Sequence, residues 1–167
     1  MKFELDTIEP VSFDNEELAK IILARFGLTP KKRDSEAALG KVILELYEKK
    51  KESLREKKPE LSVLSVESMA ALAGIKRQTM YEYLSRFLSL NILKKTSFVS
   101  GGKIIIGYEL NGNNLESAFR KAEYVLKAHV DYTFKLIEKL QNEIKKEKIK
   151  SSIANKLDPS QIQEDFV

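Results

Sequence analysis

The sequence predicts a mainly α-helical protein with one small β-hairpin, an α+β fold. Only 7 Gly and 4 Pro interrupt its 167 residues, and 43% apolar with 32% charged residues is typical of helices with one polar face. Apolar residues recur at helical spacing along most of the chain, and one stretch, residues 92–110, changes to strand character. This length suits one domain with extensions and excludes a large multidomain enzyme.

Residues 1–33 are expected to form an acidic N-terminal extension with one helix over residues 15–26. Asp14 followed by Glu17 matches a capping box, and Gly27 provides a helix stop. Residues 1–20 contain six acids and two bases, so this end should avoid phosphates.

Residues 34–111 are expected to form the main domain, which begins with a helix over residues 35–57. Asp34 is its predicted N-cap, and Pro59 ends it. Its apolar stripe contains Ala38, Val42 and Leu46, with Leu39, Ile43 and Tyr47 beside them.

Two short helices are predicted to follow, joined by a glycine turn. The first begins at Ser65 and ends at Gly74, and the second places Met80, Leu84 and Phe87 on one side. Tyr83 is expected to pack in the core.

Two strands, over residues 92–99 and 103–110, are predicted to form a hairpin. Gly101 and Gly102 suit the positive φ angles of its tight turn.

Residues 112–150 are expected to form a long helix that serves as a dimerisation device. Asn113 and Glu116 form a possible capping box, and the helical pattern continues to about Ile149. Its a/d seam consists of two series spaced by seven residues that interleave at four and three: Phe119, Leu126, Thr133 and Leu140, and Val130, Ile137 and Ile144. The seam is longer than one small domain can cover, which favours a homodimer. The alternative is a helix that folds back on residues 15–57.

The only histidine, His129, lies within this stripe. It lacks nearby metal-binding partners, so we interpret it as a packed or pH-sensitive interface residue. Residues 151–167 are expected to be a flexible tail, or a segment ordered only against a partner.

Several classes of function are excluded by absent patterns. The chain has no cysteine, so disulfides, thiol catalysis and thiolate metal sites are ruled out. No phosphate-binding glycine loop, His–carboxylate cluster or nucleophile elbow is present, and we expect no enzyme activity and no cofactor. No secretory signal and no apolar run of about 20 residues is visible, so a soluble cytoplasmic protein without membrane contact is expected.

The order of elements over residues 35–110 resembles the winged helix-turn-helix fold. The segment from Leu64 to Lys95, with apolar positions around Ala70, Gly74, Ile75 and Leu84, is similar to the DNA-binding core of MarR, PadR and related archaeal and bacterial regulators. The resemblance implies a dimeric transcriptional regulator that binds double-stranded DNA. Three positions depart from the family pattern: Lys76 replaces a capping Ser or Thr, Asn91 replaces a glycine, and Glu82 lies on the presumed DNA face.

The residue types support the same interpretation. The major groove admits a helix, and Arg and Gln pair bidentately with guanine and adenine, so Arg77 and Gln78 are candidates for base contacts. Residues 76–103 contain six bases and one acid. The candidate DNA-binding residues are Lys76, Arg77, Gln78, Tyr81, Arg86, Lys94, Lys95 and Lys103. In a dimer, two such helices about 34 Å apart would match an inverted-repeat operator.

The alternative hypothesis is a protein–protein interaction module. Winged helices also serve in transcription, replication and chromosome-organising complexes. In that case, a protein partner would bind through the acidic N-terminal helix or the C-terminal tail.

Overall fold

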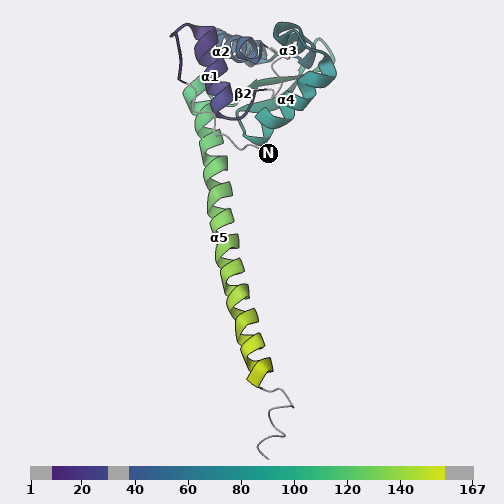
Figure 1. The fold of residues 1–167 in the computed structure, drawn as a ribbon. Coiled ribbons are helices and arrows are strands. Elements are labelled where there is room, and N and C mark those ends of the chain that lie inside the picture. Colours follow the sequence, from purple (N-terminus) through teal and green to yellow (C-terminus); the bar gives the residue numbers. More distant parts are fainter. Residues whose placement is uncertain (1–8, 30–37, 157–167) are drawn as a thin grey trace, which may run out of the picture. The chain divides into compact units, whose positions relative to one another are not determined.

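The computed structural model describes residues 9–29 and 38–156 (Figure 1). It divides into two compact units, residues 1–125 and 126–167. The elements in order are α1 (Asn15–Arg25), α2 (Leu39–Glu56), the 3₁₀ helix η1 (Pro59–Ser62), α3 (Val66–Ala73), α4 (Arg77–Ser89), β1 (Leu93–Ser100), β2 (Lys103–Leu110) and α5 (Leu115–Lys156). The prediction of a mainly helical protein with one antiparallel hairpin is confirmed.

Local hydrogen bonds cap both ends of helix α1. The Asp14 carboxylate accepts from the backbone N–H groups of Glu16 (2.9 Å) and Glu17 (3.2 Å). At the other end Gly27 adopts φ +69°, which lets Leu28 donate to the carbonyl of Leu23 at 2.9 Å. These contacts confirm the predicted N-cap and glycine stop.

Helix α2 begins at Leu39, four residues after the predicted start at residue 35. Ala38 has a non-helical backbone, and its N–H donates to the carbonyl of Ala73 at 3.1 Å, so a contact with the end of α3 fixes this start. Asp34, the predicted N-cap, lies outside the described residues. The helix ends at Glu56, before Pro59.

Helices α3 and α4 pack against each other across a short turn. The Ser65 hydroxyl caps α3 by accepting from the Ser68 N–H at 3.1 Å. Gly74 takes φ +67°, and Ile75 then donates to the carbonyl of Ala70 at 3.0 Å. Asn91 takes φ +59° after α4, the left-handed conformation that asparagine tolerates.

Strands β1 and β2 pair in register, with Ser100 opposite Lys103. Gly101 and Gly102 adopt φ +58° and +77°, as expected for the two central residues of a type I′ turn.

The base of β2 also pairs with Leu64, which exchanges two backbone hydrogen bonds with Tyr108 at 2.8 and 2.9 Å. Gly107 permits this approach, because a Cβ atom there would lie 2.2 Å from Cγ1 of Val63. The bridge attaches the hairpin to the segment that precedes α3, and it was not predicted from the sequence.

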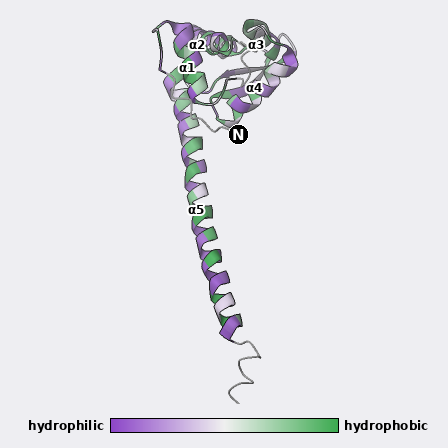
Figure 2. Cartoon of the chain, viewed as in Figure 1, coloured by the Kyte–Doolittle hydropathy of each residue, from purple (hydrophilic) through white to green (hydrophobic). Residues whose placement is uncertain are grey.

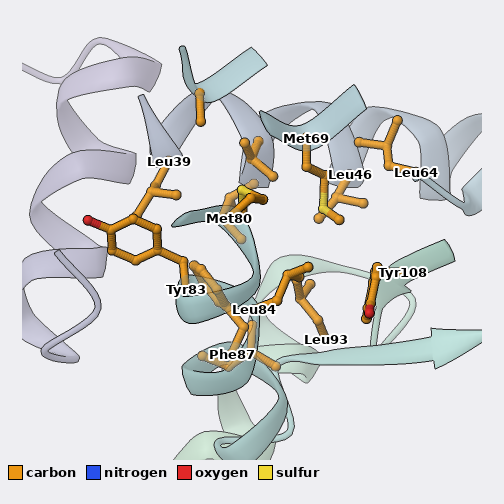
Figure 3. Close-up of a cluster of buried hydrophobic side chains, with 14 of the residues drawn as sticks. Leu39, Leu46, Leu64, Met69, Met80, Tyr83, Leu84, Phe87, Leu93 and Tyr108 are labelled. Carbon is orange, nitrogen blue, oxygen red and sulfur yellow. The ribbon is translucent and has the colours of Figure 1, made fainter. Parts of the chain in front are cut away.

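The core of the first unit joins its α-helices to the base of the hairpin (Figure 3). Leu46, Met69, Met80, Phe87 and Leu93 are among its fully buried side chains. Tyr83 is buried with them, as predicted.

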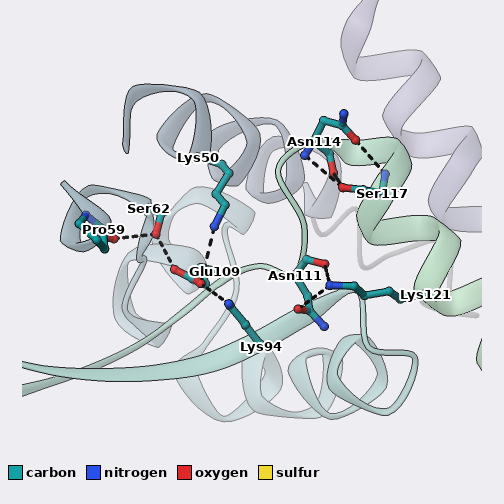
Figure 4. A network of polar contacts seen from close by, with 9 residues as sticks. All are labelled: Lys50, Pro59, Ser62, Lys94, Glu109, Asn111, Asn114, Ser117 and Lys121. Carbon is teal, nitrogen blue, oxygen red and sulfur yellow. Dashed lines mark hydrogen bonds and ion pairs between the residues drawn. The ribbon is translucent and has the colours of Figure 1, made fainter. Parts of the chain in front are cut away.

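The first turns of α5 belong to the same core. Ala118 and Ala122 are fully buried, and the rings of Phe26 and Phe119 lie 5.1 Å apart. Phe119, predicted as a dimer residue, therefore packs within its own unit. A capping box opens α5, but Asn114 and Ser117 form it, one residue beyond the predicted pair (Figure 4).

The second unit is described over residues 126–156, all of them helical. The helix continues to Lys156 rather than ending near Ile149, because no glycine or proline interrupts it before Pro159. Residues 151–156 are thus helical and not part of a flexible tail, while 157–167 lie outside the described residues. No described helix is long and apolar enough to cross a membrane.

Candidate nucleic-acid interface

Helix α4 separates apolar and polar residues onto opposite sides. Met80, Leu84 and Phe87 are buried against the core. The opposite side is exposed, and we call it the α4 face: Arg77, Gln78, Tyr81, Glu82, Ser85 and Arg86. The predicted contact residues of this helix are therefore all open to a partner in the described structure.

The N-terminus of α4 is open to an anion. Lys76 is the N-cap, and its side chain makes no capping hydrogen bond. The N–H groups of a first helical turn have no partner within the helix, and the helix dipole adds partial positive charge there. Lys76 adds a full charge to the same end, and Arg77 adds a second one that is paired with Glu67 of α3.

Arg77 is held in place by residues of two helices. Its Nε lies 3.0 Å from Oε1 of Glu67 on α3, and its Nη2 donates to the Tyr81 hydroxyl at 3.2 Å. The hydrogen bond to Tyr81, together with electrostatic attraction to Tyr81 and Glu67, raises the pKa of Arg77 above its ordinary value. The guanidinium is thus charged and oriented, and the edge formed by Nη1 and Nη2 can still meet a bidentate acceptor.

The hairpin lysines have two different environments. Lys94 lies opposite Glu109 in the β1–β2 register, and its Nζ is 3.0 Å from Oε1 of that carboxylate. Lys95 and Lys103 are exposed, and the described residues provide no ion pair for either. Lys95 and Lys103 therefore carry the unpaired charge of the hairpin, whereas Lys94 is paired with Glu109, which it shares with Lys50.

Glu109 is the centre of a polar network that the sequence analysis missed (Figure 4). Its side chain is only 8% exposed and accepts from the Ser62 hydroxyl at 2.5 Å, and Nζ of Lys50 lies 3.7 Å from its Oε1. Burial alone would raise the pKa of Glu109, but the hydrogen bonds from Ser62 and Lys94 and the two lysine charges outweigh it and lower the pKa. The only sequence signal was an acid inside the apolar β2 pattern.

This lowered pKa predicts a pH-dependent contribution to stability. A carboxylate with a depressed pKa stabilises the folded state above its unfolded pKa of about 4.3, and the contribution disappears as the pH falls through the folded pKa. We expect Glu109→Gln to lower the free energy of unfolding by about 1–2 kcal/mol at neutral pH and to have little effect well below pH ~4. Urea unfolding of both proteins across this range tests it, and an equal difference at every pH would contradict it.

The far end of the hairpin is apolar, which the sequence analysis did not interpret. Val99 and Ile104 face each other across the strands and are 73% and 72% exposed, and Ile106 is 52% exposed. We call these three residues the hairpin patch. Exposed apolar residues this close together mark a surface for a further contact.

The predicted dimerisation residues divide between the two units. Phe119 belongs to the first unit, and the other six lie on the second unit with exposed side chains. Thr133 donates its hydroxyl hydrogen to the carbonyl of His129 at 2.8 Å. The seam from Leu126 to Ile144 is thus uncovered in the described chain.

Comparisons with protein-family models, with curated proteins and with solved structures found no match. Within residues 9–29 and 38–156, no group of three or more His, Cys, Asp or Glu side chains could hold a metal ion. The geometry of α4, the hairpin and α5 is therefore what indicates a function.

Proposed function

We propose that residues 34–111 form a winged helix-turn-helix domain that binds double-stranded DNA in a dimeric transcriptional regulator. In this proposal α4 is the recognition helix and the β1–β2 hairpin is the wing. The observation that carries it is the α4 face, which is exposed and has a basic, uncapped N-terminus beside the turn at Gly74. A protein of this function would work in the cytoplasm and need no catalytic residue.

The geometry of the helix pair supports this role. Helix α3 supports α4 from the buried side, so α4 can enter a major groove about 12 Å wide without losing its core contacts. The N-terminal residues of a recognition helix usually meet the base edges. Arg77 and Gln78 hold those positions, while Lys76 and Arg86 are suited to the flanking phosphates.

The hairpin would contact the sugar–phosphate backbone through Lys95 and Lys103. Lys103 follows Gly102 at the tip. The two glycines there have no side chains, so a phosphate can approach the backbone closely. Lys94 is a weaker candidate, because contact with phosphate would compete with Glu109 for the same ammonium group.

Fluorescence anisotropy with a duplex selected from a random-sequence pool tests the proposal. Binding should weaken steeply with salt, because each neutralised phosphate releases counterions. Lys103→Ala should reduce the slope of log K against log salt by about one, whereas Lys41→Ala, an exposed lysine of α2, should leave it unchanged. Failure to enrich any sequence, with no salt-dependent binding, would contradict the proposal.

The hairpin patch favours a second candidate, a protein–protein interaction module. Val99, Ile104 and Ile106 are apolar where backbone contacts to DNA call for polar groups. A purified complex with a stoichiometric protein partner and no retained nucleic acid would favour this candidate. Loss of that partner in Val99→Ser/Ile104→Ser, with an unchanged fold, would assign the contact to the patch.

A further inference from the structure

The second unit has an exposed apolar surface that one helix alone cannot bury. We call it the α5 stripe: Leu126, Val130, Thr133, Phe134, Leu136, Ile137, Leu140 and Ile144. Its seven large apolar side chains are 43–64% exposed, and Figure 2 shows hydrophobic and hydrophilic residues alternating along this helix. A helix is stabilised mainly by packing of its apolar face, so this stripe requires a partner surface of matching length.

The positions in the stripe read the same from either end of the helix. Leu126 matches Ile144, Val130 matches Leu140, Thr133 matches Ile137, and Phe134 matches Leu136, since each pair of numbers adds to 270. In heptad terms Leu126, Thr133 and Leu140 occupy d, and Val130, Ile137 and Ile144 occupy a. Every matched seam pair therefore joins a d position to an a position, which is the core pairing of two antiparallel helices.

We propose that a second copy of this chain covers the α5 stripe in antiparallel orientation, centred near residue 135. The inference rests on the dimer of the proposed function and adds its orientation and register. Leu126 then packs against the partner's Ile144, and Val130 against the partner's Leu140. The surface is self-complementary, as a two-fold contact between identical chains requires.

The residues beside the seam distinguish this arrangement from a parallel one. Antiparallel pairing brings Phe134 beside the partner's Phe134 and Leu136 beside the partner's Leu136, so both apolar flanks are covered. It also brings His129 near the partner's Glu143. Parallel pairing would instead set Phe134 beside the partner's His129 and Leu136 beside the partner's Gln141, leaving apolar against polar side chains.

Charge favours the same orientation. Lys145, Lys146, Lys148 and Lys150 form a basic segment after the stripe, in which Glu147 is the only acid. Parallel helices would place the two basic segments side by side, with like charges adjacent along both helices. Antiparallel helices separate them and place each beside residues 120–125 of the partner's α5, where Arg120, Lys121 and Glu123 leave a net charge of only +1 (2 − 1).

Engineered cysteines test the orientation, because the chain has none of its own. A disulfide requires Cα atoms within about 7 Å. In the proposed dimer, residue 126 and its copy lie roughly 27 Å apart along the helix axis, because 18 residues separate the paired levels. Leu126→Cys and Ile144→Cys should each form no covalent dimer on mild oxidation, whereas the double variant in one chain should form it in most molecules.

Three controls complete the experiment. Lys135→Cys, on the side of the helix away from the stripe, should not cross-link. Sedimentation equilibrium of the unmodified full chain should give a dimer. A covalent dimer in both single variants would overturn the antiparallel orientation, and a monomer or a higher oligomer would overturn the proposed partner. Anisotropy of the unmodified protein on DNA measures the proposed function separately, so either proposal can fail alone.

Discussion

Arg77→Ala is expected to weaken binding to the selected duplex by roughly 10- to 100-fold and to relax preference at one base pair. Arg77 is the only arginine at the N-terminus of α4, and Glu67 and Tyr81 orient its guanidinium before DNA arrives. A side chain that is already oriented loses little conformational entropy on binding. Its removal therefore takes away both the contact with DNA and the benefit of the prior orientation. Anisotropy on the selected duplex and on single-base variants measures both effects.

Two comparisons separate base recognition from charge. Arg77→Lys keeps the charge but loses the planar fork, so it should retain nonspecific binding and lose the base preference. Arg55→Ala removes an exposed arginine from α2 and should change neither quantity. Unchanged affinity and unchanged preference in Arg77→Ala would remove Arg77 from the interface.

Local signals made much of the fold predictable. The starts of α1 and α3 depend on Asp14 and Ser65, whose side chains bond to N–H groups two or three residues away. The stop of α3 and the hairpin turn depend on glycines with positive φ. Each of these interactions joins residues only a few positions apart, so a short stretch of sequence contains both partners.

Predictions failed where distant residues decide the outcome. The start of α2 is fixed by Ala73, far along the chain, and the bridge between Leu64 and Tyr108 joins segments separated by three elements. The capping box of α5 moved to Asn114 and Ser117 because Asn113 and Asn114 are equally good caps by type, and only the geometry of the preceding turn selects one.

The candidate site was likewise predictable from the sequence only where local interactions decide its structure. The 3.6-residue period identified the α4 face, since burial of Met80, Leu84 and Phe87 leaves only one side open. The periodicity gives no information on which acids pair with the predicted basic contact residues. Glu67 of α3 pairs with Arg77 and orients its side chain. Glu109 pairs with Lys94 across the hairpin, which makes Lys94 less available to a phosphate.

Ile137→Glu is expected to convert the dimer to a monomer and to weaken binding to an inverted-repeat duplex by about a hundredfold or more. Ile137 is near the centre of the α5 stripe, where the proposed register sets it against the partner's Thr133. Each dimer would then bury two unpaired carboxylates, which is unfavourable enough to separate the helices. Once the copies separate, the second half-site no longer benefits from the high effective concentration that tethering provides.

Asn142→Glu is the matched control, because it adds the same charge on the side of α5 away from the stripe. It should leave both the dimer and the affinity unchanged. Ile137 lies outside the core of the first unit. Urea unfolding of that unit should therefore be the same in the unmodified protein, Ile137→Glu and Asn142→Glu. A dimer that survives Ile137→Glu would place the contact elsewhere, whereas a monomer that binds DNA as tightly as before would separate DNA binding from dimerisation.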